Sequence, residues 1–428
     1  MDTFNVDGIN YIIITNYTVS VYNNESFSEL ELIIPSFVEY NSITYNVTNI
    51  VDGAFSGNNI FTTALFPDTL VNIGSNAFQG CYSLSKIDLS NCNLLNNLKD
   101  CFLNCYNLTS ILFPSSLKTL GNNTFEKCYS LTSIDLSICT LLTSIGTGCF
   151  GFCSNLSSII IPASIVTIGN DAFLYCVSLT TIDLSSCINL SSLGTGCFGF
   201  CSNLSSIIIP ASIETIDNDT FLYCISLKNI DLSKCTLITR LGIGCFGFCN
   251  NLSSILLPPL LKEIDETAFY QCSSLIEIII PSSVTNIGIG AFDSCSKLNK
   301  VTFLGNTIPT LTSSSFLSIS SPSTAYYQYN VTNLSYLKSF QFFTNYIALT
   351  NPNPEPIPSS SNNYYPIYTP YLQPASSLGS AGRINGSTSL GSRSKIGGCN
   401  RIYNYYHTLH QEQSFLTNVA FQIYGIKK

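Results

Sequence analysis

The sequence predicts an α/β repeat solenoid of about twelve coils, with a parallel β-sheet on one face. Three observations support this fold class. The 48-residue stretch Gly146–Leu193 is followed directly by a near-copy of itself, Gly194–Leu241. A phenylalanine recurs every 23–25 residues through most of the chain. Within each interval the apolar residues first recur at helical spacing and then alternate as they do in a strand.

The recurring phenylalanine defines the coils of the array, which we place at residues 51–318. A unit of this size cannot bury its apolar face alone, so each coil must stack on its neighbours. Read in this way, the 48-residue stretch is two coils, one of 25 and one of 23 residues, that were duplicated as a pair. The landmark residues are Phe55, Phe78, Phe102, Phe125, Phe150, Phe173, Phe198, Phe221, Phe246, Phe269, Phe292 and Phe316.

The segments outside the array have other compositions. Residues 1–50 alternate apolar and polar positions between Asn and Ser, which predicts a β-rich N-terminal cap. Residues 319–349 are apolar enough to cap the last coil. Residues 350–398 are rich in Pro, Ser and Gly, as a linker or arm is. Residues 399–428 regain aromatic and aliphatic content, and we assign them no fold.

The units resemble the BspA-type leucine-rich repeat proteins, whose motif is C-x-x-L-x-x-I-x-[IL]-P-x-x-[VLI]-x-x-I-G-x-x-A-F. The segment Cys272–Phe292, CSSLIEIIIPSSVTNIGIGAF, matches every motif position, and the lead-in Ile34–Phe55 is similar to the first unit of that family. The resemblance covers about residues 30–316. It implies a curved leucine-rich repeat array used for adhesion or protein recognition, with no enzymatic activity in the repeats. Every second unit from Asp88 to Asp231 departs from the motif, because it is longer and reads I-D-L-S-x-C.

Composition and charge narrow the function. Residues 1–349 carry 11 basic and 23 acidic side chains, a net charge of −12, whereas residues 350–428 carry six and two, a net charge of +4. An acidic body argues against nucleic acid as a partner. The N-terminus shows no signal peptide, and no apolar run is long enough for a transmembrane segment. The sequence therefore indicates a cytosolic protein, with a surface or virion location open by a non-classical route.

The 19 cysteines fall into columns. Ten occupy the third place after the landmark Phe, and stacked neighbours would lie within the Cα separation that a disulfide tolerates, roughly 4.4–6.8 Å. The alternative is that each thiol fills a small apolar slot. Four units also show C-F-x-x-C, a spacing that suggests zinc. In other units Ala or Thr occupies the position of the first cysteine, directly before the landmark Phe. We therefore expect that this position requires a small residue, and we expect no metal or cofactor. The ten are Cys81, Cys105, Cys128, Cys153, Cys176, Cys201, Cys224, Cys249, Cys272 and Cys295.

The candidate binding site is one outward position of the predicted strand, where acidic and aliphatic residues alternate from coil to coil. Carboxylates two coils apart would be roughly 10 Å from each other, too far to share a calcium ion. Two interpretations stay open: a solvated strand face shaped by duplication, or a contact surface, since exposed aliphatic rows are costly unless covered. The nine residues are Asp88, Leu112, Asp135, Ile160, Asp183, Ile208, Asp231, Leu256 and Ile279.

Catalytic signals are nearly absent. The two histidines, His407 and His410, lie near Cys399 in the C-terminal segment, where a metal cluster would lack a fourth ligand and paired cysteine spacing. The array offers no base beside a nucleophile. Possible N-glycosylation acceptors are frequent, as they are by composition in a chain rich in Asn and Ser. They include Asn16, Asn46, Asn107, Asn155, Asn203, Asn251 and Asn385.

We therefore predict a non-enzymatic recognition or adhesion protein that binds a protein or glycan through the strand face. The alternative is a structural component of a virion or protist surface layer, with assembly contacts made through residues 350–428. Either function would require export of the protein, by a route that the sequence does not reveal.

Overall fold

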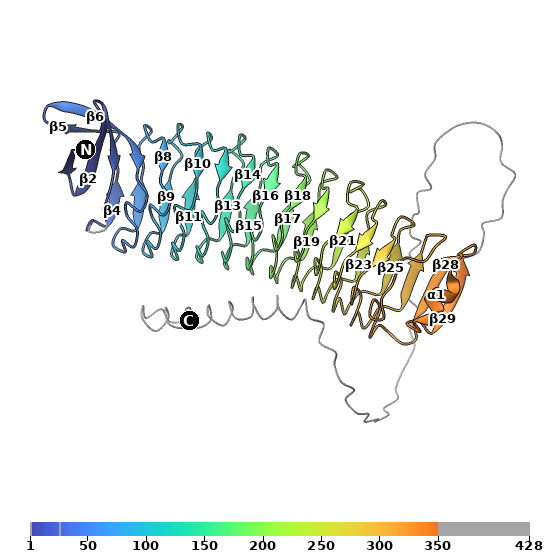
Figure 1. Ribbon diagram of the computed structural model, residues 1–428. Helices are drawn as coiled ribbons and strands as arrows, with labels where there is room; N and C mark the ends of the chain where they lie inside the picture. Colours follow the sequence, from blue (N-terminus) through green and yellow to red (C-terminus); the bar gives the residue numbers. More distant parts are fainter. Residues whose placement is uncertain (1, 25–26, 350–428) are drawn as a thin grey trace, which may run out of the picture. The chain divides into compact units, whose positions relative to one another are not determined.

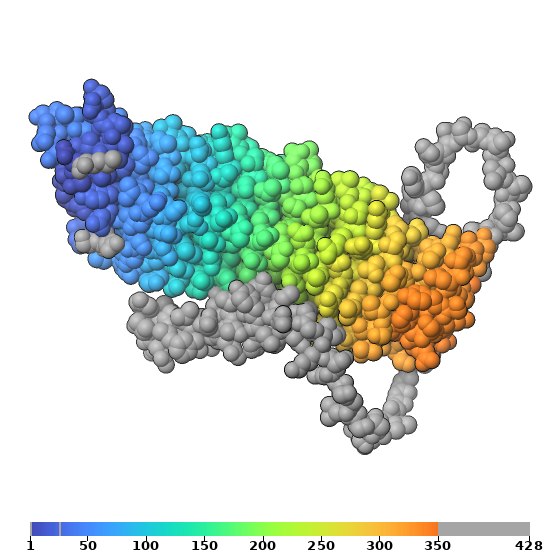
Figure 2. Space-filling view, in the orientation of Figure 1, coloured from blue at the N-terminus to red at the C-terminus, as the bar shows by residue number. Residues whose placement is uncertain are grey.

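The computed structural model describes residues 2–24 and 27–349, and these residues form a solenoid of stacked coils (Figure 1). Most coils contribute one short strand to each of two rows, and the strands that pair between successive coils are parallel. In Figure 2 the colours follow one another as bands across this unit, because each coil packs on its neighbours in sequence. The predicted leucine-rich repeat solenoid is thus confirmed.

The first row of strands contains the predicted strand face. It has fourteen members, two more than there are landmark phenylalanines, because one strand precedes Phe55 and another follows the last full coil. They are β4 (Glu31–Ile33), β7 (Thr63–Leu65), β9 (Lys86–Asp88), β11 (Ser110–Leu112), β13 (Ser133–Asp135), β15 (Ser158–Ile160), β17 (Thr181–Asp183), β19 (Ser206–Ile208), β21 (Asn229–Asp231), β23 (Ser254–Leu256), β25 (Glu277–Ile280), β27 (Lys300–Phe303), β28 (Thr324–Gln328) and β29 (Asn345–Leu349).

The second row was not expected from the sequence. It forms one uninterrupted nine-stranded parallel sheet from β10 to β26, preceded by β8. Its strands are two residues long, too short for an alternating pattern to be visible. They are β8 (Asn72–Ile73), β10 (Asn97–Leu98), β12 (Thr119–Leu120), β14 (Ser144–Ile145), β16 (Thr167–Ile168), β18 (Ser192–Leu193), β20 (Thr215–Ile216), β22 (Arg240–Leu241), β24 (Glu263–Ile264) and β26 (Asn286–Ile287).

The part of each unit with helical apolar spacing forms consecutive turns, not an α-helix. The backbone N–H of a landmark residue is directed out of its own coil: that of Phe150 donates to the carbonyl of Ala172 at 2.8 Å, and that of Phe173 donates to Cys197 at 2.9 Å. A helix would have to keep such donors within the segment. Bonds between coils therefore replace helical bonds, and the array consists of strands and turns.

The landmark phenylalanines form a continuous stack through the core. All twelve are at most 1% exposed, and successive rings lie parallel with centroids between 4.9 Å (Phe292–Phe316) and 5.7 Å (Phe198–Phe221). Offset stacking at such distances is favourable for aromatic rings, in addition to the apolar area that they bury. The stack belongs to one hydrophobic cluster that runs from the N-terminal strands to Phe343.

The long and short coils differ in one segment, the link between the two strands of a coil. In a long coil the link spans residues 136–143, whereas in the following short coil it spans residues 161–166. The two extra residues thus leave the turns and both strands in register. On the strand face the ladder is discontinuous: β7 pairs with β9, β13 with β15 and β17 with β19, but β15 and β17 form no ladder.

The two ends of the solenoid are built differently. At the N-terminus β1 (Thr3–Val6), β2 (Ile9–Thr15), β3 (Thr18–Val21), β5 (Phe37–Tyr40) and β6 (Ile43–Ile50) form a mixed sheet that joins the second row through β8. At the other end α1 (Leu334–Ser339) packs beside β28 and β29. Within the part of the chain that the structure describes, no helix has the length and apolarity needed to cross a lipid bilayer.

Candidate binding surface

The nine predicted residues do lie at one position of the strand face. All are exposed except Asp88, which is half-buried. The aliphatic members show about half of their surface, for example 54% for Ile160 and 50% for Ile208. In the paired strands each acid faces an aliphatic residue of the next coil, with Asp135 opposite Ile160 and Asp183 opposite Ile208. The remaining partners are Asp88 with Leu112, Asp231 with Leu256, and Ile279 with Thr302.

Each acid of this row also closes the turn that follows its strand. The backbone N–H of Ser137 donates to Asp135 Oδ1 at 2.8 Å, and that of Ser185 donates to Asp183 Oδ1 at 2.9 Å. Asp88 and Asp231 accept the same bond from Ser90 and Ser233. Aspartate commonly bonds the backbone two residues on in this way. The alternation therefore has a local structural cause: long coils use the aspartate turn where short coils use proline.

The carboxylates of the row are nonetheless available as charges. Hydrogen bonds from the hydroxyl and backbone N–H of Ser137 lower the pKa of Asp135, and those of Ser185 lower the pKa of Asp183. Bonds to the charged form favour ionisation. Both side chains are exposed, so these acids are ionised at neutral pH beside the aliphatic residues of the neighbouring coils.

A second set of exposed aliphatic residues borders the row, and sequence reasoning missed it. These side chains lie in the longer links, directly after strands that end in aspartate. Ile188 is 72% exposed, and Leu141 is 52% exposed while Leu142 beside it is buried. The signal was present in the sequence, because each long link holds one or two aliphatic residues more than the core has room for. We call this set the link row: Leu94, Ile138, Leu141, Ile188 and Leu237.

The line of the nine predicted residues, which we call the strand row, is longer than predicted. Leu65 faces Asp88 across the ladder, and Ile33 faces Leu65. These two aliphatic side chains are 40% and 55% exposed. Toward the C-terminus the row is interrupted at Thr302, which is buried, and an exposed aliphatic side chain returns at Ile347. Apolar surface is therefore present in long and short coils alike, in the strand row of the short coils and the link row of the long ones.

The cysteine columns link coils by hydrogen bonds. All eighteen cysteines of the described residues are free and buried. Each of the ten predicted column members donates its Sγ–H to the carbonyl of the preceding coil's landmark residue, as Cys201 does to Phe173 at 3.2 Å. The long coils add a second column, in which Cys187 donates to Pro162 at 3.6 Å. The thiols thus fill small slots and satisfy carbonyls that face the core.

We expect these thiols to be unreactive in the folded protein. Burial raises the pKa of Cys81 to about 12 and holds the pKa of Cys201 well above its ordinary value, and only the thiolate is a good nucleophile. Alkylation of the native protein followed by peptide mass spectrometry should leave the eighteen cysteines of residues 27–349 unlabelled. The same reaction in denaturant without reductant should label all of them. Peptides joined by a disulfide between neighbouring column members would contradict this expectation.

No group of three or more His, Cys, Asp or Glu side chains in the described residues is arranged to hold a metal ion. The C-F-x-x-C pairs, such as Cys149 and Cys153, lie on turns inside the core. Thr124 occupies the slot of Cys149 in the preceding coil and donates to the carbonyls of Leu98 and Gly121. This substitution agrees with a slot that selects for size. His407, His410 and Cys399 lie outside the described residues.

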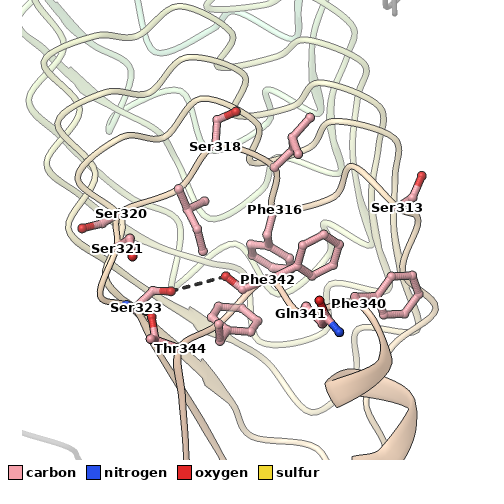
Figure 3. A pocket seen from close by; sticks show the side chains of 13 residues that line it. Ser313, Phe316, Ser318, Ser320, Ser321, Ser323, Phe340, Gln341, Phe342 and Thr344 are labelled. Atoms are coloured by element: carbon pink, nitrogen blue, oxygen red, sulfur yellow. Dashed lines mark hydrogen bonds between the residues drawn. The ribbon is translucent and has the colours of Figure 1, made fainter. Parts of the chain in front are cut away.

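A cleft of about 480 Å³ lies at the C-terminal end of the array, where the last turns meet the segment after α1 (Figure 3). Its lining includes the aromatic rings of Phe316, Phe342 and Phe343 and several hydroxyl groups. Among these, Ser323 Oγ donates to the carbonyl of Phe342 at 3.4 Å (Figure 3). None of its lining side chains titrates near neutral pH. The cleft therefore provides no general acid, base or charged nucleophile.

The strand row and the link row together make a surface suited to contact. The ionised acids can accept hydrogen bonds or pair with cations, and the aliphatic side chains can bury area against a partner. Exposed aliphatic residues on the second row of strands are fewer, since those positions are mostly Asn, Ser and Thr.

Comparison with known proteins agrees with this architecture. The BspA type leucine rich repeat region matches the chain in three overlapping segments, residues 36–141, 135–242 and 223–347. No curated protein matches the chain significantly.

Two solved structures are among those similar to this chain. A leucine-rich repeat protein from Bacteroides ovatus is 25% identical with a TM-score of 0.55, and the match covers 81% of this chain and 100% of that one. A leucine rich cell surface protein from Faecalibacterium prausnitzii is 21% identical with a TM-score of 0.46, covering 82% of this chain and 96% of that one.

Proposed function

The chain belongs to the BspA-type leucine-rich repeat family, and on that premise we propose that it is a non-enzymatic recognition or adhesion protein. Leucine-rich repeat families are generally non-catalytic, and their arrays present extended surfaces made of many equivalent coils. The partner would be a protein or a glycan that lies across the strand face. The nine predicted residues would form the centre of the contact, with the link row along one edge.

The observation that carries this proposal is the recurrence of exposed aliphatic side chains at one position of the strand face, in every second coil. Leu112, Ile160, Ile208 and Leu256 each show about half of their surface, although the core has taken up the other aliphatic residues of their strands. An apolar surface of this extent marks an interaction site in most soluble proteins. The ionised acids between these side chains would provide orientation, because complementary charge fixes the register of a partner.

The experiment compares the intact full-length chain with the double variant Ile160→Ser, Ile208→Ser. Binding is measured on immobilised candidate proteins and on a panel of immobilised glycans. Each replacement removes an aliphatic contact worth on the order of 1 kcal/mol or more in an interface, so the pair should weaken binding about tenfold or more. Both positions are exposed, and the thermal unfolding of the variant should be unchanged within about 0.5 kcal/mol.

The matched control replaces two exposed aliphatic residues away from the strand face, Val166→Ser and Ile289→Ser. Binding by this control should equal that of the intact chain. The alternative function, an assembly component, predicts a different outcome. In that case removal of residues 350–428 abolishes self-association in light scattering, while changes at Asp135, Ile160, Asp183 and Ile208 have no effect on any binding.

A further inference from the structure

Four asparagines share one place in the coil and stand in Asn-Leu-Ser or Asn-Leu-Thr sequences. Each lies two residues after a column cysteine and shortly before a strand of the first row, in every second coil. Their positions form one line along the array. They are Asn107, Asn155, Asn203 and Asn251.

The three positions of each sequence have different structural roles. The middle leucine, for example Leu156, is fully buried in the core. The hydroxyl of the third residue donates to a backbone carbonyl of the preceding coil, as Ser157 Oγ does to Thr132 at 2.9 Å. Ser205, Ser253 and Thr109 make the equivalent bond. Packing and hydrogen bonding thus account for the second and third residues without any modification.

The asparagine is the residue that the fold does not use. All four are exposed, and their side chains make no hydrogen bond within the described residues. In the intervening coils the equivalent residues, such as Ser130 and Ser178, are serines. An amide at this place can therefore carry a large substituent without displacing any contact of the array.

Other asparagines in acceptor sequences are built into the structure. Asn24 is 1% exposed, and its side chain accepts from the backbone of Asn10 and donates to the carbonyl of Tyr22 at 3.0 Å. Asn333 uses both ends of its amide on Ile308, accepting at 2.8 Å and donating at 3.2 Å. A sugar on Nδ2 would disrupt these bonds, so these two acceptor sequences do not suit modification in the folded chain.

We propose that Asn107, Asn155, Asn203 and Asn251 form a row of N-glycan acceptors. The donor class is an oligosaccharide linked to a polyprenyl diphosphate. In the transfer, Nδ2 forms a bond to the anomeric carbon, the bond from that carbon to the diphosphate oxygen breaks, the diphosphate leaves with the electron pair, and the amide proton passes to a base of the transferase. The glycans would stand about 10 Å apart, two coils per step, along one edge of the strand face.

The test uses the full chain, directed by an added secretory leader into the secretory pathway of a eukaryotic host. Folded protein is collected from the medium, and an amidase that releases N-glycans converts each occupied asparagine to aspartate. Peptide mass spectrometry should show this conversion at the four row positions and not at Asn24 or Asn333. Each single change, such as Asn155→Gln, should remove the conversion at its own position only.

Two results would overturn the proposal: absence of conversion throughout the row in secreted protein, or conversion at Asn24 and Asn333 as complete as in the row. The Gln variants should keep the unfolding temperature of the intact, deglycosylated chain, because the four side chains are exposed and their amides make no hydrogen bond within the described residues. A loss of folding in those variants would show that the asparagines are structural and would equally count against the row. The outcome does not depend on whether the strand face binds a partner.

Discussion

Replacement of Phe198 by alanine is expected to lower the free energy of unfolding by about 3–5 kcal/mol, the range for a large aromatic side chain removed from a core. Phe198 is fully buried and stacks on Phe173 at 5.3 Å and on Phe221 at 5.7 Å. The packed neighbouring coils would leave a cavity with little room to collapse. Denaturant unfolding followed by far-ultraviolet circular dichroism measures the change.

The position of Phe198 in the middle of the array adds a second expectation. Because the stability of a repeat protein is a sum of coil and nearest-neighbour terms, a weak interface should uncouple the coils on either side. Unfolding of the variant should become broader or separate into two transitions. Phe37→Ala is the matched control, since Phe37 is 61% exposed and should change stability by no more than about 0.5 kcal/mol. Equal losses in the two variants would contradict a stack that stabilises the array.

Replacement of Asp219 by asparagine is expected to stabilise the protein at neutral and mildly alkaline pH. Asp219 is 4% exposed, and its Oδ1 has no hydrogen-bond partner. Gly244 of the next coil covers it so closely that a Cβ there would lie 2.5 Å from Oδ1. Burial, and to a lesser extent the charge of Asp171, raise the pKa of Asp219 to about 7. Ionisation of this carboxyl therefore opposes folding.

The pH dependence follows from the raised pKa. At a pH of about 3 or lower the carboxyl is mostly protonated in both folded and unfolded chains, and the Asn variant should have little advantage from charge. As the pH rises from about 4 to about 7, only the unfolded chain ionises freely, so the intact protein loses stability relative to the variant. Above that range the difference should level off, at up to about 4 kcal/mol. Unfolding curves measured from pH 4 to pH 8 check this.

The matched control is Asp183→Asn on the exposed strand row. Asparagine can accept the same bond from the backbone of Ser185. Its effect should be small, with a slight loss at neutral pH, because the pKa of Asp183 is lowered and its charge favours folding. If Asp183→Asn stabilised the protein as much as Asp219→Asn, the effect would come from the lower net negative charge and not from the burial of Asp219.

Asp219 shows that a repeat pattern in the sequence does not reveal which acidic side chains are buried. Asp171 and Asp219 are equivalent residues of the duplicated pair, and both backbones adopt positive φ, 54° and 55°. In the sequence they are indistinguishable from surface acids of a turn. Only the stacking of coils buries these carboxyls, which raises the pKa of Asp171 to about 6 and that of the more deeply buried Asp219 to about 7.

For the strand row, in contrast, the periodicity of the sequence was sufficient to predict where the residues lie. The constant offset from each landmark Phe predicted that the nine residues from Asp88 to Ile279 share a line, and the side-chain alternation of strands predicted their outward direction. The sequence did not reveal the bond from Ser137 to Asp135, because a two-residue contact in a turn depends on local backbone angles. It also did not reveal that the ladder is absent between β15 and β17.

By itself the sequence determined the solenoid, its repeat lengths, the recurrence of the landmark phenylalanines and the line of the strand row, since each depends on a period that recurs many times in the chain. The tertiary structure alone decided that turns replace helices, that a second parallel sheet runs through the array, and which cysteines, acids and asparagines are used by their neighbours. These features depend on contacts between residues about one coil apart, such as Cys201 with Phe173. A spacing in the sequence predicts that two coils meet, but the atoms that meet depend on how the coils pack.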